Sequence, residues 1–187
     1  MTKIGIIIGS TRPGRNGEAV ARWVHELATK RDDAAYELVD LKDHQLPHLD
    51  EALAAAAASG VYDHPHTKIW SETIAGYDGF VFVTPEYNRG TPGVLKTAID
   101  FLYAEWHDKS AGVVGYGVSG GVRAAEHLRQ VLGQVKVANV QAGVELLLHA
   151  DFENFSVFRP RPHQEDQVTM MLDQVVAWSR ALAAVRV

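Results

Sequence analysis

The feature that most constrains the fold of this chain is its alternation of short apolar runs with longer amphipathic segments. The first run, KIGIIIG at Lys3–Gly9, holds branched and small apolar residues and ends at a glycine. Such a run is typical of a strand that is buried on both faces. Residues Glu18–Lys30 follow with apolar side chains at helical spacing. A strand, a loop and a helix in this order direct the free N–H groups of the helix start towards the loop, where they favour an anion.

The same alternation continues to the end of the chain. Further strands are expected at Tyr36–Leu41, Gly79–Thr84, Ala111–Gly117 and Val144–Leu148. Further helices are expected at Ala54–Ala58, Lys68–Ala75, Gly93–Ala104, Val122–Gln134 and Gln167–Val185. Strands that alternate with helices form a parallel sheet that is covered on both faces. With no linker or composition break, we expect one domain over residues 1–187, a three-layer doubly wound α/β fold whose five-stranded parallel sheet has the order 2-1-3-4-5.

Composition and charge exclude several classes of function. The chain has no cysteine, so disulfides, thiolate metal sites, iron–sulfur clusters and a cysteine nucleophile are excluded. The net charge is −5 and the basic residues are scattered, so neither nucleic acid nor an anionic membrane is an expected partner. The histidines, DHPH at Asp63–His66 included, show no metal-ligand spacing, and no metal site is predicted. Because neither a signal peptide nor a long apolar run is seen, we expect a cytoplasmic protein.

In a doubly wound fold, ligands bind beyond the carboxyl ends of the strands. The first loop there, GSTRPGRNG, lacks the second glycine of a dinucleotide fingerprint, and it carries Arg15 and Asn16 where a Walker A loop has Lys and Ser or Thr. The pattern instead favours a mononucleotide phosphate that is bound by hydroxyl, amide, guanidinium and peptide N–H donors. The candidate residues are Ser10, Thr11, Arg12, Arg15, Asn16 and Gly17. The alternative is that Ser, Thr and Asn serve only as helix caps and turn residues.

Two more loops should reach the same edge of the sheet. The second, TPEYNRGTPG, supplies Pro85, Glu86, Tyr87, Asn88 and Arg89. We expect Pro85 to force a sharp turn that leaves the following peptide N–H and C=O groups facing a crevice, where a flat heterocycle would use them. The alternative is a simple connection between strand and helix. In the third loop, GVSGG, Gly117, Ser119, Gly120 and Gly121 would let the backbone approach a ligand closely.

Together, the segments GSTRPGRNG, TPEYNRGTPGVLKTAIDFL and GVVGYGVSGGVRAAEHLR resemble the NAD(P)H-dependent FMN reductase family of flavodoxin-like proteins. That family includes quinone, azo-dye and chromate reductases. The resemblance implies that the first loop binds the FMN phosphate, that the second holds the isoalloxazine ring, and that the glycine loop lines its other side. The chain departs from the pattern at Arg15, where many members have serine. The role of Arg15 therefore stays open.

The resemblance also implies an activity. FMN would take a hydride from NADH or NADPH and then reduce a quinone, free flavin or similar acceptor, and the two substrates would alternate because both stack on one ring face. The flavin carries this chemistry, so no catalytic acid or base is assigned. The acceptor, the preference between NADH and NADPH, and whether FMN stays bound are left open.

The segment AEWHDKSAGVVGYG and the helix before it resemble the part of these reductases that builds a dimer interface. The apolar residues of Gly93–Ala104 nearly surround the expected helix, and one domain buries only one face of a helix. We therefore expect a homodimer, with a tetramer as a further possibility.

Two other functions compete with a reductase. A flavodoxin-like electron carrier or redox sensor would use the same fold and bind FMN without turnover. A serine hydrolase would use Ser119, which lies in a literal G-x-S-x-G pattern, with Asp151 and His163 following in a suitable order. The hydrolase reading leaves the arginine-containing first loop and PEYN unexplained.

Overall fold

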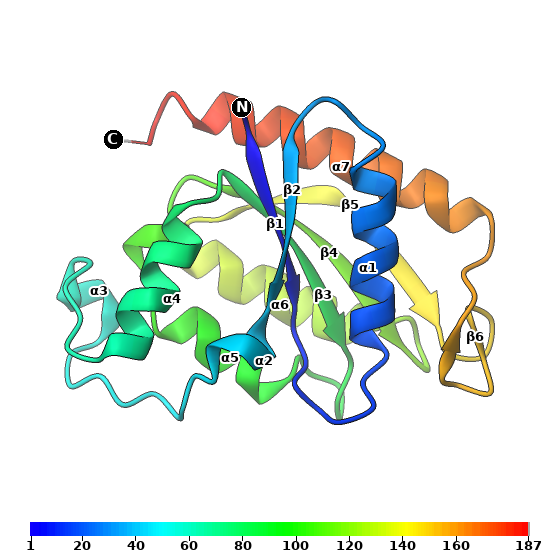
Figure 1. Cartoon of the computed structure of the whole chain (residues 1–187), viewed down its shortest axis with the longest axis horizontal. Coiled ribbons are helices and arrows are strands. Elements are labelled where there is room, and N and C mark those ends of the chain that lie inside the picture. The colour runs from blue at the N-terminus through cyan, green and yellow to red at the C-terminus, as the bar shows by residue number, and fades with distance from the viewer. Residues whose placement is uncertain (187) are drawn as a thin grey trace.

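The computed structural model describes residues 1–186 and contains a five-stranded parallel sheet with the order β2-β1-β3-β4-β5. Helices α1 (Gly17–Ala28) and α7 (His163–Leu182) pack on one face of this sheet. Helices α4 (Pro65–Ala75), α5 (Gly93–Asp100) and α6 (Val122–Gln134) pack on the other (Figure 1). This architecture confirms the predicted three-layer α/β fold and its strand order. The predicted domain, residues 1–187, ends one residue beyond the described part of the chain.

The strands follow the apolar runs of the sequence. They are β1 (Lys3–Ile8), β2 (Ala35–Asp40), β3 (Gly79–Pro85), β4 (Ser110–Gly117) and β5 (Ala138–Leu147). All residues of β3 and β4 are buried, because these central strands are covered on both faces. The buried and exposed residues of β5 alternate, because β5 is an edge strand. This alternation explains why the apolar pattern predicted only the second half of β5.

Several smaller elements were not predicted or have different bounds. The short helices α2 (Leu41–His44) and α3 (Ala55–Ala58) follow β2, and a hairpin of β6 (Phe152–Glu153) and β7 (Val157–Phe158) follows β5. Helix α7 begins at His163 and ends at Leu182, whereas the apolar spacing predicted Gln167–Val185. Helix α3 confirms the helix predicted at Ala54–Ala58, with a start one residue later. The elements that were not predicted, α2, β6 and β7, carry too few residues for a periodic signal.

The end of α5 corrects one prediction and its consequence. The helix ends at Asp100, and a 3₁₀ turn at Ala104–Trp106 follows. The indole of buried Trp106 donates a hydrogen bond to the Ile99 carbonyl, 3.1 Å away, which requires the chain to fold back. Of the apolar residues of this segment, Leu95, Ala98, Ile99, Phe101 and Leu102 are buried within the chain's own core, and Val94 is 43% exposed. The argument that this helix needs a partner to cover it was therefore wrong, and the homodimer stays a prediction.

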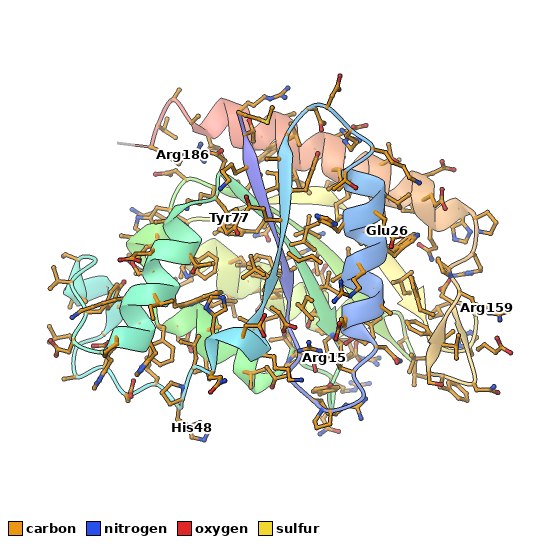
Figure 2. All side chains as sticks on the ribbon, in the orientation of Figure 1. Arg15, Glu26, His48, Tyr77, Arg159 and Arg186 are labelled. Carbon is orange, nitrogen blue, oxygen red and sulfur yellow. The ribbon has the colours of Figure 1, made fainter. Side chains whose placement is uncertain are left out.

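The parallel sheet brings the ends of β1, β3 and β4 to one edge. Figure 1 shows the loops after β1 and β3 together at the lower edge of the molecule, beside the start of α1. In Figure 2, Arg15 lies at this edge, whereas Tyr77 and Arg186 lie towards the opposite end of the strands. Within residues 1–186, no helix has the length and apolar character needed to cross a membrane.

Candidate functional site

The side chain of Tyr87 joins the first loop to the second. Its hydroxyl oxygen lies 2.9 Å from Ser10 Oγ and accepts a hydrogen bond of 3.2 Å from Arg12 Nε. Ser10 is fully enclosed, whereas Tyr87 and Arg12 are exposed. Residues 75 or more positions apart in the chain thus meet at the carboxyl ends of neighbouring strands.

The second loop is joined to the third by Glu86. This carboxylate accepts hydrogen bonds from Arg123 Nε at 2.7 Å and from the Arg123 backbone N–H at 3.1 Å. Arg123 lies in the first turn of α6, and its guanidinium also donates to Ser119 Oγ at 3.2 Å. The Glu86 side chain is nearly buried, so the ion pair holds the two loops in a fixed arrangement. Arg123 was not among the predicted residues, because nothing in its sequence position indicates that it faces Glu86.

The backbone of the first loop leaves several donors free. Pro13 and Gly14, whose φ is +67°, occupy the middle of a turn that is closed by a bond from the Arg15 N–H to the Arg12 carbonyl. Within the described chain, the N–H groups of Thr11, Gly14 and Asn16 have no hydrogen-bond acceptor. Asn16 precedes α1, but its side chain does not cap the helix and donates instead to the Phe155 carbonyl at 2.9 Å. The start of α1 therefore keeps unused N–H groups beside the loop.

Arg15 has a different environment from Arg12. Its guanidinium pairs with both carboxylate oxygens of Asp40 and with Glu18, and it donates to the Ser10 carbonyl at 2.7 Å. The side chain is only 6% exposed. Its charge is thus balanced within the protein, and it fastens the first loop to the end of β2. The sequence left the role of Arg15 open, and Asp40, its partner, was not predicted.

A buried hydroxyl lies beneath the first loop. Tyr116, at the end of β4, is 5% exposed, and its hydroxyl has no hydrogen-bond partner in the described part of the chain. A Cβ atom added to Gly17 would come within 2.7 Å of this oxygen, so the hydroxyl lies against the first residue of α1. Burial raises the pKa of Tyr116 above its ordinary value, so the hydroxyl keeps its proton. A helix start with free N–H groups, an unpaired tyrosine hydroxyl and one uncompensated arginine fit the phosphate of a mononucleotide.

The second loop turns later than the sequence indicated. Pro85 belongs to β3, and the N–H groups of Glu86 and Tyr87 are bonded to the Tyr116 and Gly90 carbonyls. The prediction that Pro85 forces the turn and leaves these groups free was therefore wrong. The turn is made by Asn88 and Arg89, whose φ angles are +50° and +71°. Within the described chain, the N–H groups of these two residues have no acceptor and are open to a ligand.

The glycines of the third loop are required mainly by the protein itself. Added Cβ atoms at Gly121 and Gly117 would meet the Tyr116 nitrogen at 2.6 Å and Glu86 Cβ at 3.3 Å. Gly120 has a φ of +69°, and Gly121 has a φ of +72°. Tight packing of the loop against β4 and the second loop thus explains these residues, and their contact with a ligand remains a prediction.

The geometry does not support a serine hydrolase. Asp151 is enclosed and accepts two hydrogen bonds from the guanidinium of Arg161, at 2.9 and 3.0 Å. Among residues 1–186, no hydrogen bond joins Ser119 to a histidine or Asp151 to His163. The carboxylate that such an enzyme would need is therefore used by Arg161.

Of two cavities in the described structure, one borders the first loop and the other lies away from all three loops. A pocket of about 210 Å³ borders the first loop at Thr11 and is otherwise lined by Leu41, Lys42, Gln45, Leu46, Val94 and Ala98. A larger cavity of about 670 Å³ follows edge strand β5 between α6 and α7, and none of the residues predicted to bind FMN lines it. In the described residues, no group of three or more acidic, histidine or cysteine side chains is arranged to hold a metal ion.

The fold and the site define a class of protein: an open parallel α/β sheet with a loop of unused backbone N–H groups at the point where the strand order reverses. Residues 2–151 match the model of the NADPH-dependent FMN reductase family. The chain belongs to this family of oxidoreductases, for which FMN and NAD(P)H are the implied cofactors. The family and the type of enzyme predicted from the three loop motifs are confirmed.

Individual relatives agree with this assignment. An NAD(P)H-dependent FMN reductase of Schizosaccharomyces pombe is 44% identical over 135 residues, which cover 72% of this chain and 68% of that protein. A quinone reductase of Pseudomonas putida is 34% identical over 136 residues, with 69% of this chain and 68% of that protein covered. FerB, a flavoenzyme NAD(P)H:(acceptor) oxidoreductase of Paracoccus denitrificans, superposes with a TM-score of 0.73 at 22% identity, covering 97% of this chain and 98% of its own. The last comparison shows the shared fold.

Proposed function

We propose that this protein reduces a quinone, free flavin or similar small acceptor with electrons from NADH or NADPH, using FMN bound at the edge where the first three loops meet. The observation that carries the proposal is the contact of the Tyr87 hydroxyl with Ser10 and Arg12. This contact joins the loop suited to a phosphate with the loop suited to a flat ring. Relatives named NAD(P)H-dependent FMN reductase and quinone reductase support the same reading.

The residues of the first loop would bind the FMN phosphate. Arg12 has a free charge, and the N–H groups of Thr11, Gly14 and Asn16 are unused within the described chain. Charge-assisted hydrogen bonds of this kind are the strong ones, and the positive end of α1 adds to them. Arg15 would act indirectly, since its pairing with Asp40 holds the loop in the shape that presents these donors.

The second and third loops would hold the flavin ring. The N–H groups of Asn88 and Arg89 have no acceptor within the described chain, and donors near a ring that gains negative charge stabilise that charge. The Glu86–Arg123 pair would keep the second loop at a constant distance from Ser119 and the glycines. FMN held by these loops would supply the two-electron redox chemistry between NAD(P)H and the acceptor.

The two substrates would bind alternately. Both substrates would use the same place beside the second and third loops, so the nicotinamide must leave before an acceptor takes its place. An alternating mechanism predicts parallel lines in double-reciprocal plots of rate against the two substrates. Intersecting lines would show that both substrates bind at once and would contradict this part of the proposal.

Anaerobic stopped-flow measurement of flavin absorbance tests the central claim. The FMN-loaded protein is mixed with NADPH or NADH without acceptor, and the reduced protein is then mixed with a quinone or with free FMN. We expect reduction within seconds and rapid two-electron reoxidation by at least one acceptor. A protein that binds FMN but is not reduced on this timescale would be an electron carrier or a redox sensor. The homodimer and the cytoplasmic location remain predictions.

A further inference from the structure

The turn of the second loop places an arginine in an unusual backbone conformation. Tyr87 and Gly90 exchange two backbone hydrogen bonds, of 2.9 and 3.0 Å, around the two residues Asn88 and Arg89. Both turn residues have positive φ, as a type I′ turn requires. Asparagine tolerates this conformation and glycine is the usual second residue, whereas arginine is disfavoured there. A disfavoured residue held in this way at a binding loop indicates a functional use for its side chain.

Arg89 differs from two of the other three arginines at these loops, because no carboxylate within residues 1–186 balances its charge. Arg15 is neutralised by Asp40 and Glu18, and Arg123 by Glu86. Arg12 donates to the uncharged hydroxyl of Tyr87. Arg89 is exposed and forms no ion pair within residues 1–186. Of the loops' arginines in the described chain, only Arg12 and Arg89 therefore keep an uncompensated charge.

These two charges match two phosphorylated ligands. The proposed function, on which this inference rests, needs FMN and a reduced nicotinamide dinucleotide at one site. Arg12 belongs to the loop with the free N–H groups and lies beside the start of α1, so it serves the FMN phosphate. Arg89 is exposed and follows Tyr87 by two residues on the hairpin that would hold the ring, so we assign it to the side from which the second substrate would enter.

We propose that Arg89 binds the pyrophosphate of NADH or NADPH and so positions the nicotinamide over the flavin. In both dinucleotides a single ribose separates the nicotinamide from the pyrophosphate, whereas the 2′-phosphate of NADPH lies at the far adenosine end. A cation next to the ring therefore reaches the pyrophosphate first. The rigid turn fixes the Arg89 backbone in advance, which reduces the entropy lost on binding.

The test compares Arg89→Asn, Arg89→Lys and Lys68→Gln in the FMN-loaded protein. Asparagine keeps the positive φ without the charge, and lysine keeps the charge. Lys68 is an exposed residue of α4, so its substitution is a control for the loss of one positive charge. The probes are the non-reducing analogues tetrahydro-NADH and tetrahydro-NADPH, whose binding is followed by the change in flavin absorbance. FMN affinity is measured separately by quenching of flavin fluorescence.

We expect Arg89→Asn to raise the dissociation constants of both analogues by about 10-fold or more, the effect of one charge-assisted hydrogen bond. Arg89→Lys should recover part of this loss. Lys68→Gln should match the wild type, and FMN affinity should stay constant. In turnover, the KM for NAD(P)H should rise while kcat at saturation is kept.

Three results would overturn the assignment. A loss confined to the NADPH analogue would move Arg89 to the 2′-phosphate, and an equal loss of FMN affinity would assign it to the flavin. Unchanged analogue binding would exclude Arg89 as a ligand. A failure of the proposed function would give a different result from a failure of this assignment. The wild-type protein would then bind the analogues, but NADH and NADPH would not reduce it.

Discussion

The substitution Gly17→Ala should have two opposing effects on the stability of the protein. Alanine has the higher helix propensity, but its Cβ would collide with one oxygen atom. Gly17 is the first residue of α1 and does not have a positive φ, so its backbone accepts alanine without strain. An added Cβ would lie 2.7 Å from the hydroxyl oxygen of Tyr116, but 3.4 and 3.5 Å from the nearest ring carbons. The ring carbons are at ordinary contact distance. The collision therefore depends on the hydroxyl oxygen alone.

The expected free energies of unfolding follow from these distances. Alanine is preferred to glycine in a helix by up to ~1 kcal/mol, and overpacking a rigid, buried site costs ~1–3 kcal/mol. We expect Gly17→Ala to lower the free energy of unfolding by about 1–2 kcal/mol. Tyr116→Phe removes a buried hydroxyl that has no partner in the described chain, so it should be neutral or stabilising by up to ~1 kcal/mol. In the double variant the collision is gone and the propensity gain of up to ~1 kcal/mol remains.

Urea denaturation of the FMN-free wild type, both single variants and the double variant measures this coupling. We expect the double variant to be at least as stable as the wild type, which gives a coupling energy of about 2 kcal/mol between the two positions. If the double variant is as unstable as Gly17→Ala alone, the hydroxyl is not the obstacle. The packing of α1 on the end of β4 would then differ from the one described here.

Two further predictions concern charged groups. Arg12→Gln should weaken FMN binding by ~1.5–3 kcal/mol and change the free energy of unfolding by less than ~0.5 kcal/mol. Arg15→Gln should lower the free energy of unfolding by about 2 kcal/mol, because it leaves the partly buried carboxylate of Asp40 without its partner. Flavin fluorescence and urea denaturation measure the two quantities, and the reverse pattern would contradict the assignment of the two arginines. Burial, reinforced by the charge of Arg186, lowers the pKa of Lys109 from 10.5 to about 8, so between these values the folded protein binds fewer protons than the unfolded chain. Its free energy of unfolding should then rise with pH, by up to about 3 kcal/mol more than that of Lys109→Met, and equal pH dependence in both proteins would refute this.

The sheet and its binding edge were predictable because their signals are local. Lys3–Ile8 and Gly79–Pro85 are continuous apolar runs, and strands that alternate with single helices favour a parallel sheet. Parallel strands end at a common edge, so the pattern alone predicted that the loops after the first, third and fourth strands would come together. The edge strand β5 was only partly recognised, since its exposed positions interrupt the apolar run.

The connections within the site were not predictable from residue types. Arg12 and Arg15 lie in one loop and look alike in sequence, yet one donates to Tyr87 and the other is paired with Asp40. Arg123 and Tyr116 were missed, because an arginine in a helix start and a tyrosine at a strand end are common. Their roles follow from residues far away in the chain, since Arg123 pairs with Glu86 and the Tyr116 hydroxyl lies against Gly17.

The sequence by itself determined the strands and helices, their alternation and the edge at which a ligand would bind, because apolar periodicity and glycine placement act between near neighbours in the chain. Only the tertiary structure decided which arginine keeps its charge, which tyrosine hydroxyl stays unpaired and where the second loop turns. The physical reason is that charge compensation, hydrogen bonding and close packing are pairwise and act over a few ångströms. They are therefore set by whichever residues folding brings together.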